Sequence, residues 1–290
     1  LADLGGDRRM ARLLQGDVGA GKTVVALMAM AAMAESGAQS ALMAPTELLA
    51  AQHFRTLQPL CEKAGLAAVL VTGKMPAAER RKAEAGLADG TIQIAVGTHA
   101  LFQSGIAFAD LGLTVVDEQH RFGVHQRLAL SSKGSRTDLL VMTATPIPRT
   151  LVLTHFGDMD VSVLRQKPAG RQPIDTAILP ATEYDRVIGR LAARIGDGAQ
   201  AYWVCPLVEE SDTLDVVAAE DRFAALKERF GNKVALVHGR MSAAQKQEAM
   251  DRFQSGEAAI LVATTVIEVG VDVPNATIMI IEHSERFGLS

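Results

Sequence analysis

Gly16-Asp17-Val18-Gly19-Ala20-Gly21-Lys22-Thr23 fits the phosphate-loop pattern G-x-x-x-x-G-K-[ST]. An apolar run precedes this stretch and a helix-forming run follows it, as such a loop requires. Its glycines let the backbone wrap around phosphate oxygens and present N–H groups at the positive end of the next helix. The alternative is a Gly-rich turn that matches by chance, and the fitting flanks argue against it. The stretch therefore predicts a nucleoside triphosphate site.

Two side chains of this stretch carry chemistry beyond the backbone. Lys22 supplies a mobile positive charge for the β- and γ-phosphates, and Thr23 offers a hydroxyl to the Mg²⁺ that bridges them. The expected metal is therefore Mg²⁺, held partly by Thr23.

Composition indicates an aliphatic-rich protein of two domains. The chain has 290 residues, of which 48% are hydrophobic and only 4% aromatic. Such a length suits two ordinary domains, and such an interior is typical of parallel sheets covered by helices. No apolar run approaches the ~18–20 residues that span a bilayer. The chain begins at Leu1 and reaches the phosphate loop almost at once, so we expect it to be a piece of a longer protein.

The two cysteines lie far apart in the sequence. Cys61 and Cys205 are separated from each other and from any histidine cluster, and no charged-then-apolar secretory segment opens the chain. We interpret both as buried thiols of a cytoplasmic protein rather than as a disulfide or a metal site.

Apolar periodicity predicts strands that alternate with helices, hence an α/β fold with two lobes, each a parallel sheet covered by helices. A charged stretch at 167–173 holds two prolines and a glycine and is the expected linker, so the lobes are expected at 1–167 and 168–290. The second series includes helices at Tyr184–Ile195 and Ser242–Phe253. The expected strands are Arg12–Gln15, Ser40–Ala44, Ala67–Val71, Ile92–Val96, Leu113–Asp117, Leu139–Thr143, Ile174–Leu179, Ala201–Cys205, Val234–His238, Ala259–Thr264 and Thr277–Glu282.

Acidic residues follow one strand of the first lobe. The segment Val115-Val116-Asp117-Glu118-Gln119-His120 places two carboxylates at the carboxyl end of a strand, where open parallel sheets bind ligands. We expect Asp117 to hold Mg²⁺ and Glu118 to orient the attacking water. The alternative is an acidic pair that opens a helix. His120 is a candidate coupling residue, or simply a polar residue at the lobe interface.

Another strand ends in Thr143-Ala144-Thr145-Pro146-Ile147-Pro148, where the prolines forbid a helix. Hydroxyls of Thr143 and Thr145 can bond the acidic segment and sense the γ-phosphate. The alternative is ordinary turn chemistry.

Eight segments of the sequence can be read together. They are GDVGAGKT, APTELLAAQH (44–53), VGTHAL (96–101), DEQHRFG (117–123), TATPIPRT (143–150), YWVCPLVEES (202–211), HGRMS (238–242) and ATTVIEVGVDVPNA (263–276). In this order they resemble superfamily 2 helicases over essentially the whole chain, and most of all the RecG-type ATP-dependent DNA helicases. The resemblance implies two tandem RecA-like lobes, with ATP and Mg²⁺ as cofactors. The transcription-repair coupling translocases, which share TATPIPRT and the RFG after the acidic motif, are the alternative.

The resemblance implies further roles for residues of this sequence. Contacts to DNA phosphates would come from strand-end segments of both lobes, which grip the backbone rather than the bases. Gly270 and Asp272 would approach the nucleotide from the second lobe, and Glu268 would join His120, Thr143 and Thr145 in coupling. The implied DNA contacts are Pro45, Thr46, Thr98, His99, His238, Gly239, Thr264 and Thr265.

The resemblance also implies partners. They are branched or forked DNA, a single-strand-binding protein and other replication-fork proteins, with a monomeric protein in the bacterial cytoplasm, associated with the nucleoid and not with a membrane. Net charge is +2 over 1–167 and −6 over 168–290, so we expect most DNA affinity to come from outside this chain. Arg80-Arg81-Lys82 is flanked by glutamates and reads as a solvated face.

The sequence departs from the family pattern at both ends. The glutamine motif, the wedge domain and the motif of the arginine finger are missing, and Arg286 is not assigned the finger role. An arginine finger contributes orders of magnitude to turnover, so this stretch alone is expected to bind nucleotide and hydrolyse it poorly. A nucleotide-dependent interaction module without useful hydrolysis is the remaining alternative, and Glu118 argues against it. A kinase that shares only the phosphate loop is disfavoured because it has no use for the second lobe.

Overall fold

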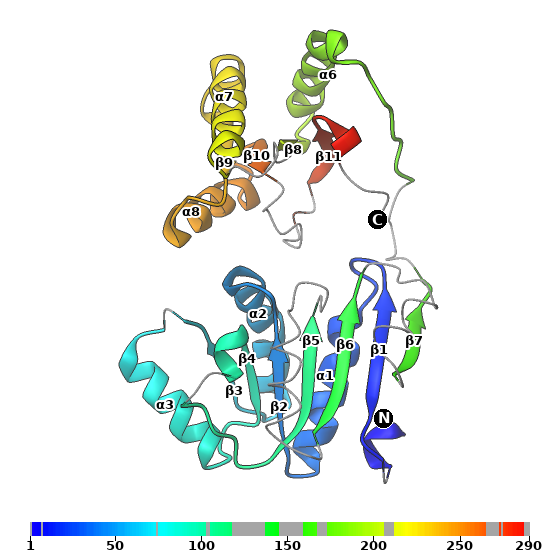
Figure 1. The fold of residues 1–290 in the computed structure, drawn as a ribbon, viewed down its shortest axis with the longest axis vertical. Helices are drawn as coiled ribbons and strands as arrows, with labels where there is room; N and C mark the ends of the chain where they lie inside the picture. The colour runs from blue at the N-terminus through cyan, green and yellow to red at the C-terminus, as the bar shows by residue number, and fades with distance from the viewer. Residues whose placement is uncertain are drawn as a thin grey trace. The chain divides into compact units, whose positions relative to one another are not determined.

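The computed structural model describes residues 2–6, 8–73, 75–102, 105–117, 137–144, 159–166, 173–205, 212–264, 273 and 275–286. The chain divides into two compact units, Leu1–Pro173 and Ile174–Ser290 (Figure 1). The expected boundary at 167/168 falls within residues 167–172, which lie outside the described ones, and stays a prediction.

The first unit is built on a parallel sheet of seven strands in the order β3-β4-β2-β5-β6-β1-β7. The register pairs Gln15 of β1 with Thr143 of β6, and Asp117 of β5 with Met142 of β6. The strands are β1 (Ala11–Gly16), β2 (Gln39–Met43), β3 (Ala68–Val71), β4 (Ile94–Gly97), β5 (Leu111–Asp117), β6 (Asp138–Thr143) and β7 (Asp160–Leu164).

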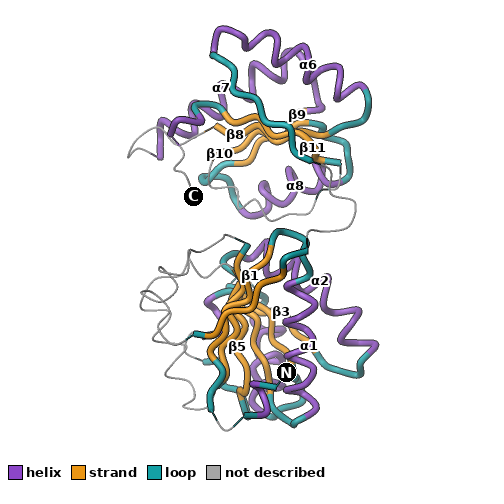
Figure 2. Tube along the Cα trace, turned by 90° about the vertical axis from the view of Figure 1, so that its right-hand side faces the viewer, coloured by secondary structure: helices purple, strands orange, loops and turns teal. Residues whose placement is uncertain are grey.

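Helices α1 (Lys22–Glu35) and α2 (Glu47–Lys63) cover one face of this sheet (Figure 2). The buried residues of α1 are Ala26, Ala29, Met30 and Met33, whose spacing forms one helical stripe. Helix α3 (Ala77–Ala88) packs Ala83 and Leu87 with Ala41 and Ala95, neighbours of the strand residues that face α1 and α2. Because successive strand residues point to opposite faces, α3 covers the other side.

The second unit has a parallel sheet of four strands in the order β11-β8-β10-β9. Trp203 is the largest fully buried side chain and packs with Leu191, Leu226 and Ile260 in a core of its own. Ser242 caps α8 in a reciprocal capping box with Gln245, which fixes where that helix begins. The elements are α6 (Tyr184–Gly196), β8 (Gln200–Cys205), α7 (Asp212–Phe230), β9 (Val234–Val237), α8 (Ala243–Gln254), β10 (Ile260–Thr264) and β11 (Ala276–Ile281).

A buried glutamine opens a strand in each unit. Gln39 is the first residue of β2, and its Nε2 donates to the carbonyls of Leu87 at 2.9 Å and Ile92 at 2.7 Å. Gln200 is the first residue of β8, and its Nε2 donates to the carbonyls of Phe253 and Ala258. Each side chain donates to one carbonyl in the last turn of a helix and to one in the segment that leads to the next strand, and so ties the two together. Composition and periodicity gave no sign of these two clamps.

Most expected elements match the structure. Ten of the expected strands and both named helices lie within two residues of the observed bounds. The strand expected at Ile174–Leu179 is wrong, because this segment forms no ladder among the described residues, and Ile174 and Ile178 are 77% and 90% exposed. Strand β7 was not expected, since its exposed edge position leaves the sequence without a continuous apolar run.

Both cysteines are free and buried, as expected. Burial raises the pKa of the Cys205 thiol to about 12, and it also raises that of Cys61. Thiols held protonated in this way are poor nucleophiles. Over the part of the chain that the structure describes, no helix is both long enough and apolar enough to span a bilayer.

Asp138, the first residue of β6, provides a stability prediction. It is buried and accepts the Met10 N–H at 2.7 Å, and burial raises its carboxyl pKa although Met10 and Arg9 oppose the rise. A raised folded-state pKa means that folding favours the protonated acid, so stability is lost as pH rises from the unfolded pKa through the folded one. Asp138→Asn keeps an acceptor without the charge. We expect it to melt above the parent protein at pH 7, with the difference shrinking towards pH 4.

The matched variant is Asp138→Ala, which leaves the buried Met10 N–H unpaired and should cost about 1–3 kcal/mol at pH 4 and less at pH 7, where the parent protein carries the buried charge. A lower melting temperature for Asp138→Asn than for the parent protein at pH 7 would contradict this account.

Candidate nucleotide and DNA site

The phosphate loop joins β1 to α1, and its glycines are required where they stand. Gly19 and Gly21 have φ of 77° and 93°, a left-handed conformation that glycine adopts without strain. A Cβ on Gly16 would lie 2.9 Å from Leu164 Cβ, so the strand that enters the loop must end in glycine to pack against β7. Helix α1 begins directly after Gly21, which aims its N-terminal amides at the loop.

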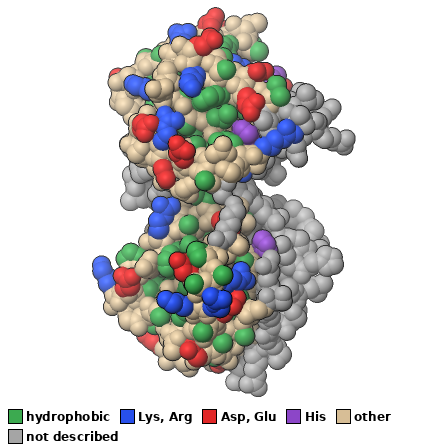
Figure 3. All heavy atoms as spheres, turned by 90° about the vertical axis from the view of Figure 1, so that its left-hand side faces the viewer, with side chains coloured by type: hydrophobic (Ala, Val, Ile, Leu, Met, Phe, Trp, Pro, Cys, Tyr) green, Lys and Arg blue, Asp and Glu red, His purple; other side chains and the backbone are tan. Residues whose placement is uncertain are grey.

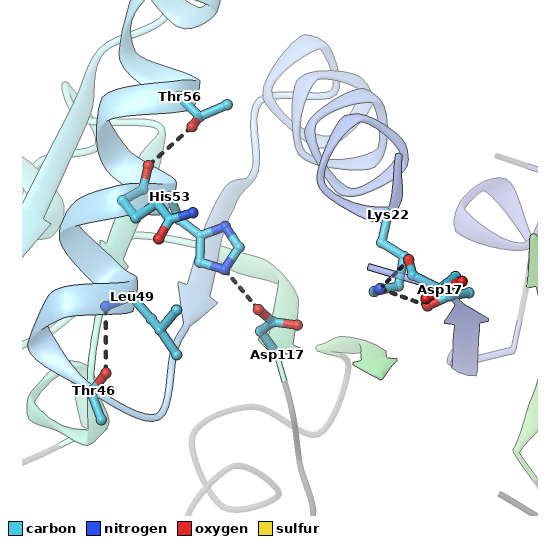
Figure 4. A network of polar contacts seen from close by, with 9 residues as sticks. Asp17, Lys22, Thr46, Leu49, His53, Thr56 and Asp117 are labelled. Atoms are coloured by element: carbon cyan, nitrogen blue, oxygen red, sulfur yellow. Dashed lines mark hydrogen bonds and ion pairs between the residues drawn. The ribbon is translucent and has the colours of Figure 1, made fainter. Parts of the chain in front are cut away.

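Lys22 points back into this loop. Its Nζ donates to the backbone carbonyls of Gly16 at 2.7 Å and Asp17 at 3.0 Å (Figure 4). The loop is further tightened by Asp17, whose carboxylate accepts the Val18 N–H at 2.8 Å. The ammonium group therefore lies where the loop backbone turns, beside the amides expected to hold phosphate.

Asp117 ends β5 and meets a residue from another element. Its Oδ2 lies 2.7 Å from Nε2 of His53 on α2, and the two side chains are only 14% and 13% exposed. Figure 4 shows the imidazole directed from α2 at the carboxylate. His53 belongs to the segment 44–53, which is one of those that carry the resemblance, but the sequence did not predict a functional role for it. A contact between residues 64 positions apart leaves no periodic signal in the sequence.

The strand order gathers the first-unit segments at one edge. Strands β2, β5, β6 and β1 are consecutive in the sheet and all parallel. Their carboxyl ends lead to the segment 44–46, Asp117, Thr143 and the phosphate loop, respectively. Strand β4, next to β2, leads to Thr98 and His99. This is the edge at which open parallel sheets bind ligands.

The oxygen donors at this edge fit Mg²⁺. Thr23 offers a hydroxyl and Asp117 a carboxylate, both hard ligands that Mg²⁺ prefers. The described residues hold no cluster of three or more His, Cys, Asp or Glu that would bind a metal alone. Mg²⁺ that is bound together with a nucleotide needs only one or two protein ligands, because phosphate oxygens and water complete its coordination shell.

The DNA-contact candidates of the first unit differ in exposure. His99 is exposed, whereas Thr98 is buried and its Oγ1 accepts the Ala100 N–H at 3.4 Å. Thr46 caps α2, and its Oγ1 accepts the Leu49 N–H at 3.4 Å. The hydroxyls of Thr46 and Thr98 therefore each accept a hydrogen bond within the fold and keep their own O–H as a donor. Pro45 is partly buried beside them.

In the second unit, His238 follows β9 and Thr264 ends the adjacent strand β10. Both are buried, and neither His238 Nδ1 nor Thr264 Oγ1 has a hydrogen-bond partner among the described residues. A buried polar atom without a partner is costly, and a bound ligand removes that cost. Gly239 is exposed beside His238, and its carbonyl accepts Lys246 Nζ at 3.1 Å.

Several candidates lie outside the described residues, so their roles stay predictions. They are Glu118, His120, Thr145, Thr265, Glu268, Gly270 and Asp272.

Charge is mixed over the face drawn in Figure 3, where Lys and Arg side chains alternate with Asp and Glu. Arg80 pairs with Glu84 at 2.9 Å on α3, while Arg81 and Lys82 are exposed. This agrees with the interpretation of that basic run as a solvated face.

Comparison with known proteins gives consistent similarities. A model of the family described as "DEAD/DEAH box helicase" matches residues 6–153, and one described as "Helicase conserved C-terminal domain" matches 184–287. The ATP-dependent DNA helicase RecG of Acidithiobacillus ferridurans is 53% identical over 100% of this chain and 42% of its own length. RecG of Escherichia coli K12 is 49% identical over 99% of this chain and 42% of its own. The chain thus spans well under half of these curated relatives.

Solved structures agree. A structure of RecG bound to a three-way DNA junction matches with a TM-score of 0.81 and 40% identity, over 100% of this chain and 38% of that one. The helicase Mss116, at 17% identity and a TM-score of 0.73, shares the fold. The expected α/β fold of two RecA-like lobes and the resemblance drawn from the sequence motifs are confirmed.

Proposed function

The chain belongs to the DEAD/DEAH box helicase family, and we propose that it forms the ATP-driven motor of a RecG-type DNA helicase. Its work would be to remodel stalled replication forks and to branch-migrate Holliday junctions. The observation that carries this proposal is the similarity to RecG along the entire chain, in both units. That similarity favours the RecG type over the transcription-repair coupling translocases.

The nucleotide chemistry follows from the first unit. The loop amides and Lys22 would bind the phosphates of ATP, while Thr23 and Asp117 would hold Mg²⁺. Bound there, Mg²⁺ neutralises charge on the phosphate oxygens. Glu118, next to Asp117 in sequence, would orient the attacking water. The arrangement of these groups on neighbouring strand ends supports hydrolysis of ATP.

The DNA contacts draw on both units. The unpartnered buried atoms of His238 and Thr264 support a ligand at the ends of β9 and β10, and Thr46, Thr98 and His99 follow strand ends in the first unit. Contacts of this kind bind phosphates and allow movement along any sequence. The proposed partners are branched DNA and replication-fork proteins such as a single-strand-binding protein. The protein would act as a monomer in the bacterial cytoplasm, associated with the nucleoid.

The test uses a protein that carries this chain with its native flanking sequence at the length of the RecG relatives, called here the extended protein. Its steady-state ATP hydrolysis is measured without DNA, with linear duplex and with forked DNA of the same composition and length. We expect DNA to stimulate hydrolysis, and the fork to stimulate it several-fold more than the linear duplex. Lys22→Ala provides the blank for contaminating activity. Equal rates with and without DNA would reject the helicase proposal.

A further inference from the structure

One contact at the site has no part in the chemistry proposed above. His53 Nε2 lies 2.7 Å from Asp117 Oδ2, and both side chains are largely buried. An ionised carboxylate only accepts hydrogen bonds, so the proton in this contact lies on Nε2. The bond uses Oδ2, and no hydrogen bond to Oδ1 is seen among the described residues.

The contact is not needed to hold α2 in place. This helix already buries Leu49, Ala50, Leu57 and Cys61 against the sheet and carries a Thr46 cap. Leu57 and Cys61 lie in the main core cluster of the unit, with strand residues such as Ile94. A helix anchored in this way gives the imidazole a fixed base from which to orient a flexible carboxylate.

We propose that His53 is a positioning residue that holds the Asp117 carboxylate in the orientation that Mg²⁺ requires. This inference rests on the proposed function, in which Asp117 is a Mg²⁺ ligand. Carboxylates that bind metals are commonly held by a hydrogen bond from a second residue, and losing such a partner weakens metal affinity by about 10–100-fold.

The experiment measures binding of a fluorescent, non-hydrolysable ATP analogue to the extended protein as free Mg²⁺ is varied. We expect His53→Ala to raise the Mg²⁺ concentration for half-maximal binding about tenfold or more. Binding in EDTA should be unchanged, because the nucleotide phosphates are held by the loop. His53→Gln can still present an N–H, so its Mg²⁺ midpoint should lie close to that of the parent protein. Gln58→Ala, exposed on the same helix, is the matched control.

A double-mutant cycle with Asp117→Asn separates the proposal that Asp117 binds Mg²⁺ from the proposal that His53 positions its carboxylate. If His53 acts only through Asp117, His53→Ala should add nothing in the Asp117→Asn background. An unchanged Mg²⁺ midpoint in His53→Ala, alongside a shifted one in Asp117→Asn, would overturn the positioning role alone. An unchanged midpoint in Asp117→Asn would instead reject the proposed metal ligand. Thermal melting identifies any variant that fails to fold. If His53→Ala does not fold, the titration of His53→Gln is used instead. A shift of its Mg²⁺ midpoint by tenfold or more would then overturn the positioning role of His53.

Discussion

Replacing Lys22 by alanine should weaken binding of Mg·ATP by about 10- to 100-fold. The ammonium group lies 2.7 Å and 3.0 Å from two carbonyls of the phosphate loop, so it is already positioned beside the site of the phosphates. A hydrogen bond to a charged group contributes about 1.5–3 kcal/mol, and about 1.4 kcal/mol corresponds to tenfold in affinity. Calorimetric titration of ATP into the extended protein measures the loss.

Glu118→Gln gives the contrasting result. The carboxylate is expected to act on water and not on the phosphates, so ATP affinity should be kept while turnover falls on the order of 10²–10⁴-fold. Lys63→Ala, at the exposed end of α2, removes a positive charge far from the loop in sequence and is the matched control for Lys22→Ala. Normal ATP affinity in Lys22→Ala would contradict the assignment of the phosphate loop.

The paired substitution of Thr143 and Thr145 by alanine should abolish fork unwinding and leave ATP hydrolysis within a few-fold of the parent protein. Thr143 ends β6, between β5 with Asp117 and β1 with the phosphate loop, which is where a coupling residue can sense both. Neither hydroxyl has a proposed role in the chemical step. The change therefore removes coupling and spares catalysis.

Serine at both positions keeps the hydroxyls and is the control for lost volume, because Thr143 is buried. Unwinding and ATP hydrolysis are measured on the same preparation, and thermal melting checks the fold. If unwinding by the alanine variant falls only in proportion to its ATP hydrolysis, the coupling role is wrong.

Local rules account for what the sequence predicted well. The phosphate loop follows from glycines whose positive φ and close approach no other residue provides, at Gly19, Gly21 and Gly16. Buried parallel strands read as continuous apolar runs, so most strand bounds could be predicted from the sequence. The strand ends then fixed which segments meet, because parallel order places them at one edge.

The predictions from the sequence were wrong or incomplete where a structure depends on contacts with another part of the chain. Ile174–Leu179 has the apolar alternation of a strand, but a strand also needs a neighbour to bond, and none of the described residues pairs with it. Strand β7 is the reverse case. Its apolar residues do not form a continuous run, but the segment pairs with β1 at the edge of the sheet and so forms a strand. The His53–Asp117 contact joins residues from two elements, and no local pattern announces it.

The central claim is that this chain is the motor of a RecG-type helicase, and ATP-dependent unwinding of a three-way DNA junction tests it most directly. The extended protein is mixed with a labelled junction in the presence of ATP, of a non-hydrolysable analogue, or of no nucleotide, and strand release is followed in time. Of these three conditions, the account predicts strand release only with ATP. It predicts no release by the Lys22→Ala variant under any of them. ATP hydrolysis that proceeds with junction DNA present but without strand release would contradict it.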